Sequence, residues 1–276
     1  ALNCPACVHV QWRDQWVARS VNLRYFRGDN AYIWQYRQAV SSVELKTYCV
    51  LRYLEDRDRR GLLRLLKEDG AFGCWTFRFH GRGPVSRDLL DSINEIDFLD
   101  QHLGLFERKS LRVLDIGAGY GRLAHRMCEA VPAVTRYSCV DAIPQSTFLC
   151  EYYLRFRGVG ARAEVIPLDE FEVRTSAGDY DLAVNVHSFS ECTIGAIEWW
   201  IGQLIRLRVP YLFIVPNDAD RLLSTEGGGV GIDFAPLLER AGYELCVCRP
   251  IYDDPDLPRL IGNSDHFFLF RNPAFG

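Results

Sequence analysis

Two acids and a glycine-rich stretch carry the clearest chemistry in this sequence. The run LRVLDIGAGYGRLAHRM, residues 111–127, has Asp115 at the end of an apolar stretch and glycines at positions 117, 119 and 121. A second acid, Asp141, ends the next apolar stretch, 20 residues after Gly121. A glycine turn between a strand and a helix lets the backbone approach a nucleotide closely. The stretch therefore predicts a nucleotide site, and its details decide which nucleotide fits.

Two phosphate-binding patterns do not match this turn. A P-loop needs Gly-Lys followed by Ser or Thr, but Arg122 and Leu123 follow Gly121. A dinucleotide fingerprint needs its third glycine at position 122, which Arg122 occupies. A nicotinamide-dependent oxidoreductase is weakened by this difference and stays an alternative.

The two acids indicate a ligand without phosphate. A carboxylate at Asp115 would repel a pyrophosphate, but it can accept a hydrogen bond from a cationic amino group. Asp141, at the end of the second strand, suits a carboxylate that accepts from both ribose hydroxyls. A ligand with a ribose and an amino acid moiety fits this pattern, and S-adenosylmethionine is such a ligand.

These residues need elements to position them, and the pattern after residue 110 supplies strands and helices in alternation. Nearly continuous apolar strands that alternate with helices predict a parallel sheet covered on both faces. The segment 249–264 is rich in Pro and Asp, so the last two strands are expected to form an antiparallel hairpin. The expected strands are Leu111–Ile116, Tyr137–Asp141, Ala163–Pro167, Asp181–Val186, Tyr211–Val215, Tyr243–Cys248 and His266–Arg271. The expected helices are Arg122–Val131, Gln145–Phe156, Gly195–Arg206 and Phe234–Ala241.

The composition changes near residue 108, and the part before it is predicted to be helical. Apolar residues at helical spacing predict one or two helices over Ala31–Leu66. A further helix is expected from a Ser86 cap to Leu103, with Gly104 ending it. The chain is therefore expected to divide into a helical extension or cap, residues 1–108, and an α/β domain, residues 109–276.

Charge and cysteine usage narrow the class of protein. A net charge of −4 over 276 residues predicts neither a nucleic-acid nor a membrane partner, and no run approaches the roughly 20 apolar residues of a membrane span. Ten scattered cysteines fit free thiols in the cytoplasm. Cys4 and Cys7 could hold zinc only with a second pair, which does not follow at finger spacing, so no metal site is expected. The acidic run at Asp253, Asp254 and Asp256 is typical of solvated turns, although Mg²⁺ is an alternative.

Four stretches of the sequence resemble known families. VLDIGAGYGR resembles motif I of class I S-adenosylmethionine-dependent methyltransferases, and CVDA resembles their second motif. The segments VDAIPQSTFLCEYYL and NVHSFSE, residues 185–191, are more similar still to a family of sugar O-methyltransferases that act on polysaccharides and glycosylated natural products. The resemblance covers residues 110 to about 270, and RYFRG and the Ser86–Leu99 helix extend it loosely toward the N-terminus.

The resemblance implies a Rossmann-like fold, with seven mostly parallel strands and an antiparallel last strand. It implies that glycines at 117, 119 and 121 admit the cofactor, with Asp115 at its methionine end and Asp141 at its ribose. It also implies that Asn185 faces the sulfonium. The remaining residues implied to bind the cofactor are Ala118, Ala142, Leu168 and Asp169.

The chemistry of methyl transfer directs attention to NVHSFSE. A sulfonium methyl is already activated, so the protein mainly aligns the acceptor and excludes water. A sugar hydroxyl is a weak nucleophile, and a base within hydrogen-bond reach would help. His187 is the first candidate, or else it only shapes its loop. Glu191 is the second, as a base or a partner of His187, or else it caps the next helix.

Several properties stay open at this point. The expected acceptor is a sugar hydroxyl of a glycoside, a polysaccharide precursor or a nucleoside-like natural product. A phenol or amine acceptor and a non-catalytic cofactor-binding protein remain alternatives. Of the aromatic residues before residue 108, one or two of Tyr25, Trp34, Trp75 and Phe77 are expected to contact the acceptor. The sequence does not decide the oligomeric state, for which a homodimer is one option.

Overall fold

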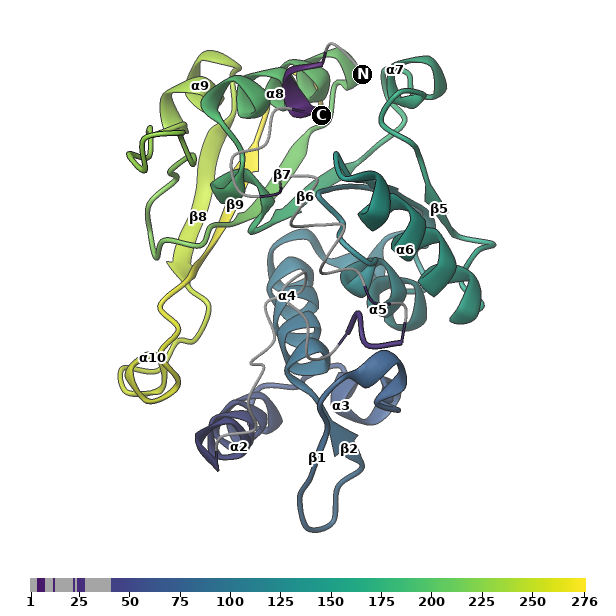
Figure 1. Ribbon diagram of the computed structural model, residues 1–276, viewed down its shortest axis with the longest axis vertical. Helices are drawn as coiled ribbons and strands as arrows, with labels where there is room; N and C mark the ends of the chain where they lie inside the picture. Colours follow the sequence, from purple (N-terminus) through teal and green to yellow (C-terminus); the bar gives the residue numbers. More distant parts are fainter. Residues whose placement is uncertain (1–3, 8–11, 13–21, 23, 28–40) are drawn as a thin grey trace.

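A seven-stranded sheet forms the centre of the protein. The computed structural model describes residues 4–7, 12, 22, 24–27 and 41–276. The sheet has the order β5-β4-β3-β6-β7-β9-β8 (Figure 1). Strand β9 is antiparallel to both of its neighbours, and the other pairings are parallel, which confirms the predicted fold class. The strands are β3 (Leu111–Ile116), β4 (Val134–Val140), β5 (Ala163–Val165), β6 (Leu182–Val186), β7 (Tyr211–Val215), β8 (Glu244–Pro250) and β9 (His266–Arg271).

Helices cover both faces of the sheet because the strand side chains alternate between two cores. In β3, Val113 belongs to the core under α4, α5 and α6, whereas Leu114 belongs to the core under α8 and α9. In β6, Val184 and Ala183 divide in the same way. These helices are α4 (Arg87–Leu103), α5 (Arg122–Ala130), α6 (Pro144–Phe156), α8 (Ile194–Leu207) and α9 (Ala235–Arg240), with a short α7 (Phe171–Arg174) between β5 and β6.

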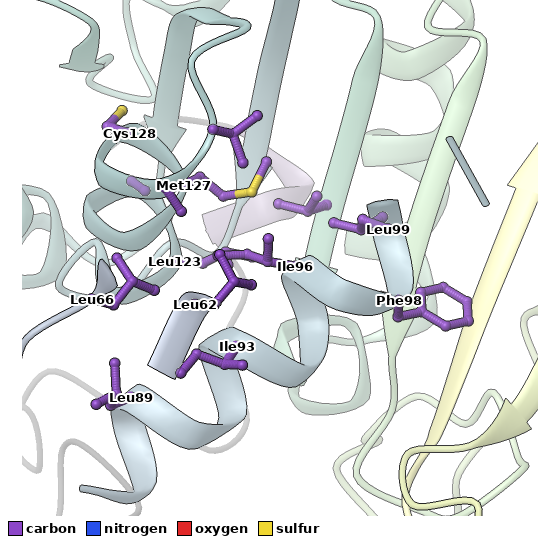
Figure 2. Packing of buried hydrophobic residues seen from close by; sticks show 14 of the residues in the cluster. Leu62, Leu66, Leu89, Ile93, Ile96, Phe98, Leu99, Leu123, Met127 and Cys128 are labelled. Carbon is purple, nitrogen blue, oxygen red and sulfur yellow. The ribbon is translucent and has the colours of Figure 1, made fainter. Parts of the chain in front are cut away.

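Helix α4 begins and ends where the sequence predicts. The Ser86 hydroxyl accepts a hydrogen bond from the Leu89 amide at 3.1 Å, and Gly104 adopts the left-handed conformation that ends the helix. Leu89, Ile93 and Ile96 face the core together with residues of α3 and α5 (Figure 2). The core is therefore continuous across residue 108, and the two-part division of the chain stays a prediction.

The segments around α4 differ in detail from the predicted pattern. Residues 31–40 of the predicted helix lie outside the described part of the chain; α2 covers Ser41–Glu55 and a separate α3 covers Leu62–Leu65. The Asp58 carboxylate accepts hydrogen bonds from the amides of Leu62 and Leu63, which starts α3 as a new helix. A small hairpin of β1 (Phe77–Arg78) and β2 (Pro84–Val85) precedes α4.

The segment between β8 and β9 contains a helix that the sequence analysis did not predict. Helix α10 covers Leu257–Ile261 and packs against α2 (Figure 1). Asp254 starts it, because its carboxylate accepts hydrogen bonds from the amides of Asp256 and Leu257. Of the three acids of this segment, Asp254 and Asp256 thus belong to a helix start, and within the described ranges no group of three or more His, Cys, Asp or Glu residues is arranged to hold a metal.

The structure also shows the state of the cysteines and the length of the helices. All ten cysteines are free thiols. Cys4 precedes and Cys7 ends a short 3-10 turn (Pro5–Cys7) that packs against α8, and Cys246 and Cys248 are exposed on β8. Of the helices in the described residues, none is long and apolar enough to cross a bilayer.

Candidate functional site

The glycine turn joins β3 to α5, and each of its glycines has its own structural reason. All three have positive φ, at 75° for Gly117, 58° for Gly119 and 85° for Gly121. A Cβ on Gly117 would lie 2.1 Å from the Ser188 Oγ, and one on Gly121 would lie 2.9 Å from the Cys150 Sγ. A Cβ on Gly119 would meet nothing within 4 Å. Gly119 therefore faces open space, whereas the other two permit close packing.

Asp115 lies beneath this turn in a buried position. Asp115 is only 5% exposed, and its Oδ2 accepts a hydrogen bond from the Tyr137 hydroxyl at 2.9 Å. Burial raises its pKa to about 7, although the Tyr137 hydrogen bond acts in the opposite direction. A nearby cation would favour the ionised form, so Asp115 is suited to a cationic ligand group.

Asp141 fixes the turn from the neighbouring strand. One carboxylate oxygen accepts from the Gly119 amide at 3.0 Å, and the other accepts from the Ile143 amide at 2.8 Å. Burial raises its pKa to about 6 against the effect of those two amides, and the charge of Glu191 raises it further. The carboxylate is thereby held in one orientation at the end of β4.

A first cavity of about 230 Å³ lies over the turn. Of the residues predicted to bind a cofactor or act in catalysis, it is lined by Asp115, Gly117, Ala118, Gly119, Asp141, Ala142, His187 and Glu191. Three further predicted residues lie outside this lining: Gly121 at the start of α5, the half-buried Leu168, and the exposed Asp169. Their roles stay predictions.

Asn185 has a structural position that its sequence context did not indicate. The residue is fully buried and does not line the cavity. Its amide donates to the Ile116 carbonyl at 2.9 Å and accepts from the Phe189 amide at 2.8 Å. Asn185 therefore joins the end of β3 to the 3-10 turn η4 (Ser188–Glu191), and a direct contact with a ligand stays a prediction.

A second cavity of about 680 Å³ adjoins the first. Its walls come from α2, the β1 region, the first turns of α4, and the end of the segment that precedes β9. Trp75 and Phe77, two of the aromatic residues expected near an acceptor, line it; Tyr25 does not, and Trp34 lies outside the described residues. Arg87, Asp91 and His187 line both cavities. The sequence predicted that the region before residue 108 contributes to an acceptor pocket, but it did not predict which segments form the walls, because they are far apart in the chain.

His187 stands between the two cavities. It directly follows β6, its φ is 68°, and its amide donates to the Val215 carbonyl at 2.7 Å. A positive φ is uncommon for a residue with a side chain, and such strain is frequent at functional sites. Its Nε2 lies 3.5 Å from the Asp265 Oδ2. Asp265 precedes β9, so tertiary structure alone joins the pair.

Glu191 lies at the other end of η4, in the wall of the first cavity. Its Oε2 accepts a hydrogen bond from the Trp12 indole at 2.7 Å, and its Oε1 accepts from the Asn217 amide at 3.4 Å. The predicted role of Glu191 as a second base stays a prediction. Trp12 also lines the cavity, and no sequence signal singled it out for this position.

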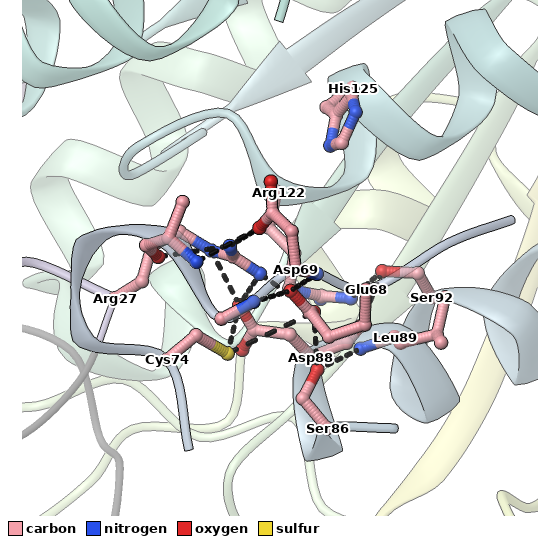
Figure 3. A network of polar contacts seen from close by, with 12 residues as sticks. Arg27, Glu68, Asp69, Cys74, Ser86, Asp88, Leu89, Ser92, Arg122 and His125 are labelled. Atoms are coloured by element: carbon pink, nitrogen blue, oxygen red, sulfur yellow. Dashed lines mark hydrogen bonds and ion pairs between the residues drawn. The ribbon is translucent and has the colours of Figure 1, made fainter. Parts of the chain in front are cut away.

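A buried polar network holds the N-terminal region against the glycine turn (Figure 3). The Tyr120 hydroxyl, within the turn, donates to the Asp88 carboxylate of α4. The Arg27 guanidinium reaches Asp88 at 3.2 Å and Glu68 at 2.9 Å. Burial alone would raise the pKa of Glu68, but Arg27, Ser86 and Arg126 lower it to about 2. The network therefore fixes the turn from outside the sheet.

Arg122 explains why the third glycine of a dinucleotide fingerprint is absent. Its guanidinium makes two hydrogen bonds to the Glu95 carboxylate, at 2.8 and 2.9 Å, and a third to the Ser92 hydroxyl at 2.8 Å. It thus anchors α5 to α4. Its charge is paired with Glu95, so it adds little attraction for a pyrophosphate.

The charges around the first cavity favour a cation over a polyanion. Five carboxylates line it, from Asp88, Asp91, Asp115, Asp141 and Glu191. Asp88 is paired with Arg27 and Asp91 with Arg87, so Asp115, Asp141 and Glu191 supply the negative charge of the lining. The two guanidiniums in the lining are paired, Arg87 with Asp91 at 3.0 Å and Arg122 with Glu95. A sulfonium and an ammonium would be attracted to this lining, whereas a pyrophosphate would be repelled. With the open space above Gly119, the residues present fit S-adenosylmethionine and disfavour a nicotinamide dinucleotide.

Comparisons with known proteins add to this geometry. A scan against protein-family models gives no match, and neither does a search of curated proteins. The chain is similar to the 4+2 cyclase SpnF, at 14% identity and a TM-score of 0.51 over 85% of this chain and 98% of that one. It is also similar to a SAM-dependent methyltransferase from Aquifex aeolicus, at 17% identity and a TM-score of 0.45 over 64% and 96% of the two chains. For the mitomycin 7-O-methyltransferase MmcR, the identity is 18% and the TM-score 0.42, over 66% and 56% of the chains.

The strand order and the likeness to SpnF define the fold class. It is a Rossmann-like α/β fold with a seven-stranded sheet in which β9 is antiparallel to both of its neighbours. A fold can host unrelated reactions, so the activity must be argued from the site.

Proposed function

We propose that this protein is an S-adenosylmethionine-dependent O-methyltransferase that acts on a sugar hydroxyl. One observation carries the proposal: Arg87, Asp91 and His187 line both the cavity over the glycine turn and the larger cavity beside it. A transfer reaction needs a donor site and an acceptor site that meet at the reacting group. A titratable side chain at this junction is in the position that a general base requires.

The first cavity is the proposed cofactor site. Asp115 would hold the amino end of the ligand, Asp141 would accept from the ribose, and the backbone at Gly117, Ala118 and Gly119 would lie against it. When bound, S-adenosylmethionine supplies a methyl group on a positively charged sulfur. The acid-rich lining supports this assignment and speaks against the oxidoreductase alternative.

His187 would remove the proton from the acceptor hydroxyl. Its Nε2 lies near the Asp265 carboxylate, so Nδ1 is the nitrogen left to accept that proton. The Asp265 carboxylate would orient the ring and stabilise the imidazolium that forms. Asp91, held 3.0 Å from the Arg87 guanidinium, would accept a hydrogen bond from a neighbouring acceptor hydroxyl.

The second cavity supports a sugar acceptor over a phenol or amine. Its polar side chains include Lys46, Asn217 and Asn263, which can bond to several hydroxyls at once. Trp75 and Phe77 add aromatic side chains to the lining of the same cavity. A phenol offers a single hydroxyl, so it would use fewer of these polar side chains than a sugar does.

Thermal unfolding with different ligands tests the cofactor assignment. S-adenosylhomocysteine at about 100 times its Kd should add roughly 2.7 kcal/mol to the free energy of unfolding, whereas NAD should add none. Mass spectrometry of reactions with S-adenosylmethionine and a panel of sugars, phenols and amines then identifies the acceptor. No stabilisation by S-adenosylhomocysteine would contradict the proposal, and cofactor binding without transfer to any acceptor would favour a non-catalytic protein.

A further inference from the structure

The two ends of the proposed acceptor cavity differ in chemistry. The residues shared with the cofactor cavity are all polar: Arg87, Asp91 and His187. Of the residues that line only the second cavity, several are apolar: Val43, Val50, Trp75, Phe77, Leu90 and Tyr252. A ligand that fills both ends must therefore be polar where it meets His187 and apolar beyond it.

We infer that the acceptor is a glycoside with an apolar aglycone. The sugar lies against the polar junction, and the aglycone lies against α2 and the β1 region. This inference rests on the proposed function, because it names the acceptor class of the same site.

Helix α2 contributes an apolar face to this cavity. Val43, Thr47 and Val50 are spaced four and three residues apart, which puts them on one side of the helix. The Thr47 hydroxyl donates to the Val43 carbonyl at 2.8 Å, so its hydrogen is already used within the helix. Lys46 is the charged residue that α2 adds to the lining. This wall suits hydrocarbon better than a second sugar.

Other elements continue the apolar lining. Leu90 of α4 is 1% exposed, and the Tyr252 ring packs edge-to-face on Tyr53 with centroids 5.3 Å apart. Trp75 and Phe77 are half-buried beside them in the lining. Helix α10 lies beyond the carboxyl end of β8 and packs against α2 (Figure 1), and its last residue, Ile261, lines the cavity.

The charges of the cavity disfavour a nucleotide sugar as acceptor. Lys46 and Arg87 are matched by Asp91 and Asp265, so the lining has no excess of positive charge. The Arg87 guanidinium is also engaged with Asp91 at 3.0 Å. A diphosphate would need several unpaired cations or backbone amides, and it would lie near two carboxylates.

The volume favours a ligand larger than one sugar. Pockets for drug-sized ligands have volumes of about 300–1,000 Å³, and this cavity has about 680 Å³. A monosaccharide at the polar junction would leave water against the apolar walls. An aglycone that displaces this water adds affinity through burial of apolar surface.

Calorimetry on the protein saturated with S-adenosylhomocysteine tests the inference. The probes are octyl and 4-nitrophenyl glycosides of common hexoses and deoxyhexoses, the parent free sugars, and uridine diphosphate sugars. At least one glycoside should bind about tenfold tighter than its parent sugar, with a more negative heat-capacity change. Phe77→Ala and Trp75→Ala should each weaken glycoside binding by about tenfold and leave binding of S-adenosylhomocysteine unchanged.

Phe79→Ala is the matched control. Phe79 is half-buried in the same hairpin region and packs on Tyr48 with ring centroids 5.2 Å apart, but it does not line the cavity. The inference would be overturned if the free sugar bound as tightly as its glycoside, or if a nucleotide sugar bound more tightly than the glycosides. Failure of every probe to bind would overturn it as well. If both cavity variants behave like Phe79→Ala, the aglycone does not lie there. Failure of S-adenosylhomocysteine to bind would instead overturn the proposed function.

Discussion

The two cavities of this protein are built in different ways. The first is formed mainly by short segments that each follow a parallel strand: the glycine turn after β3, Asp141 after β4, and His187 after β6. The second takes its walls from α2, β1, α4 and the α10–β9 connection. The carboxyl ends of parallel strands meet at one edge by necessity, whereas the second set meets only because helices pack together. The first cavity is thus determined by topology and the second by packing.

The strongest test concerns His187, at the junction between the two cavities. His187→Ala should lower kcat by about 100-fold, because no base would accept the hydroxyl proton. Affinity for S-adenosylhomocysteine, measured by calorimetry, should stay nearly unchanged. His80→Ala, in the exposed connection of the β1–β2 hairpin, is the control. Turnover by His187→Ala at the wild-type rate would remove His187 from the mechanism.

Substitutions of two glycines in the turn should affect ligand binding and stability to different extents. Gly119→Ala should weaken binding of S-adenosylhomocysteine by at least about tenfold, since the new methyl group would enter open space over the turn. The positive φ at this position should also cost about 1–2 kcal/mol of stability.

Gly117→Ala is the counterpart of that variant. Its Cβ would lie 2.1 Å from the Ser188 Oγ, so it should lower Tm more than Gly119→Ala does. Thermal unfolding and calorimetry on the two proteins measure both effects. Unchanged affinity in Gly119→Ala would show that the ligand does not lie against this part of the turn.

A second test asks whether His187 and Asp265 act together as a unit. Asp265→Asn should lower kcat by about tenfold, because the imidazolium loses its counter-charge. In a His187→Ala background the same change should have almost no further effect, since residues that act as a unit are not additive. Asp256→Asn, exposed in the same region of the chain, controls for a general effect on the segment. Additive losses in the double variant would argue for separate roles.

The smallest expected effect is on stability and concerns the cofactor side. The pKa of Asp115 rises from 3.8 to about 7 on folding, so the folded state holds this proton more tightly than the unfolded state. Its contribution to stability is present below pH 4 and is lost as pH rises through about 7. At pH 8 and without cofactor, Asp115→Asn should therefore raise Tm by about 2–4 °C while it weakens cofactor binding.

Thermal unfolding between pH 4 and pH 8 checks this prediction. The advantage of Asp115→Asn over the wild type should shrink as the pH falls, because the wild-type carboxyl becomes neutral. A constant difference in Tm across this range would show that the effect does not come from ionisation of Asp115.

Much of the fold could be predicted because the relevant signals are local. The glycine turn, the apolar strands and the Ser86 and Gly104 caps each act within a few residues, and the structure contains each of them. Helix α10 was missed because its start depends on Asp254, a residue read as part of a Pro- and Asp-rich turn. Local rules cannot distinguish a capping carboxylate from a solvated one without the helix that follows.

The candidate site was predicted unevenly for the same reason. Asp115 and Asp141 were recognised because strand ends converge in any parallel sheet. The contact of Asp265 with His187 could not be predicted, since it depends on β9 entering the sheet antiparallel beside β7. Asn185 was expected to face the ligand, yet it is hydrogen-bonded between β3 and η4, a use that sequence spacing does not indicate.

The sequence by itself determined the strand–helix alternation, the ligand-binding turn and the two acids that flank it, because these depend on backbone conformation and on the pleat of a parallel sheet. Tertiary structure decided which side chains meet across the chain: Asp265 with His187, Tyr120 with Asp88, and α2 with α10. Those contacts bring together segments distant in sequence, and the apolar surface that drives their packing has no direction of its own. The second cavity is therefore a property of the packed molecule.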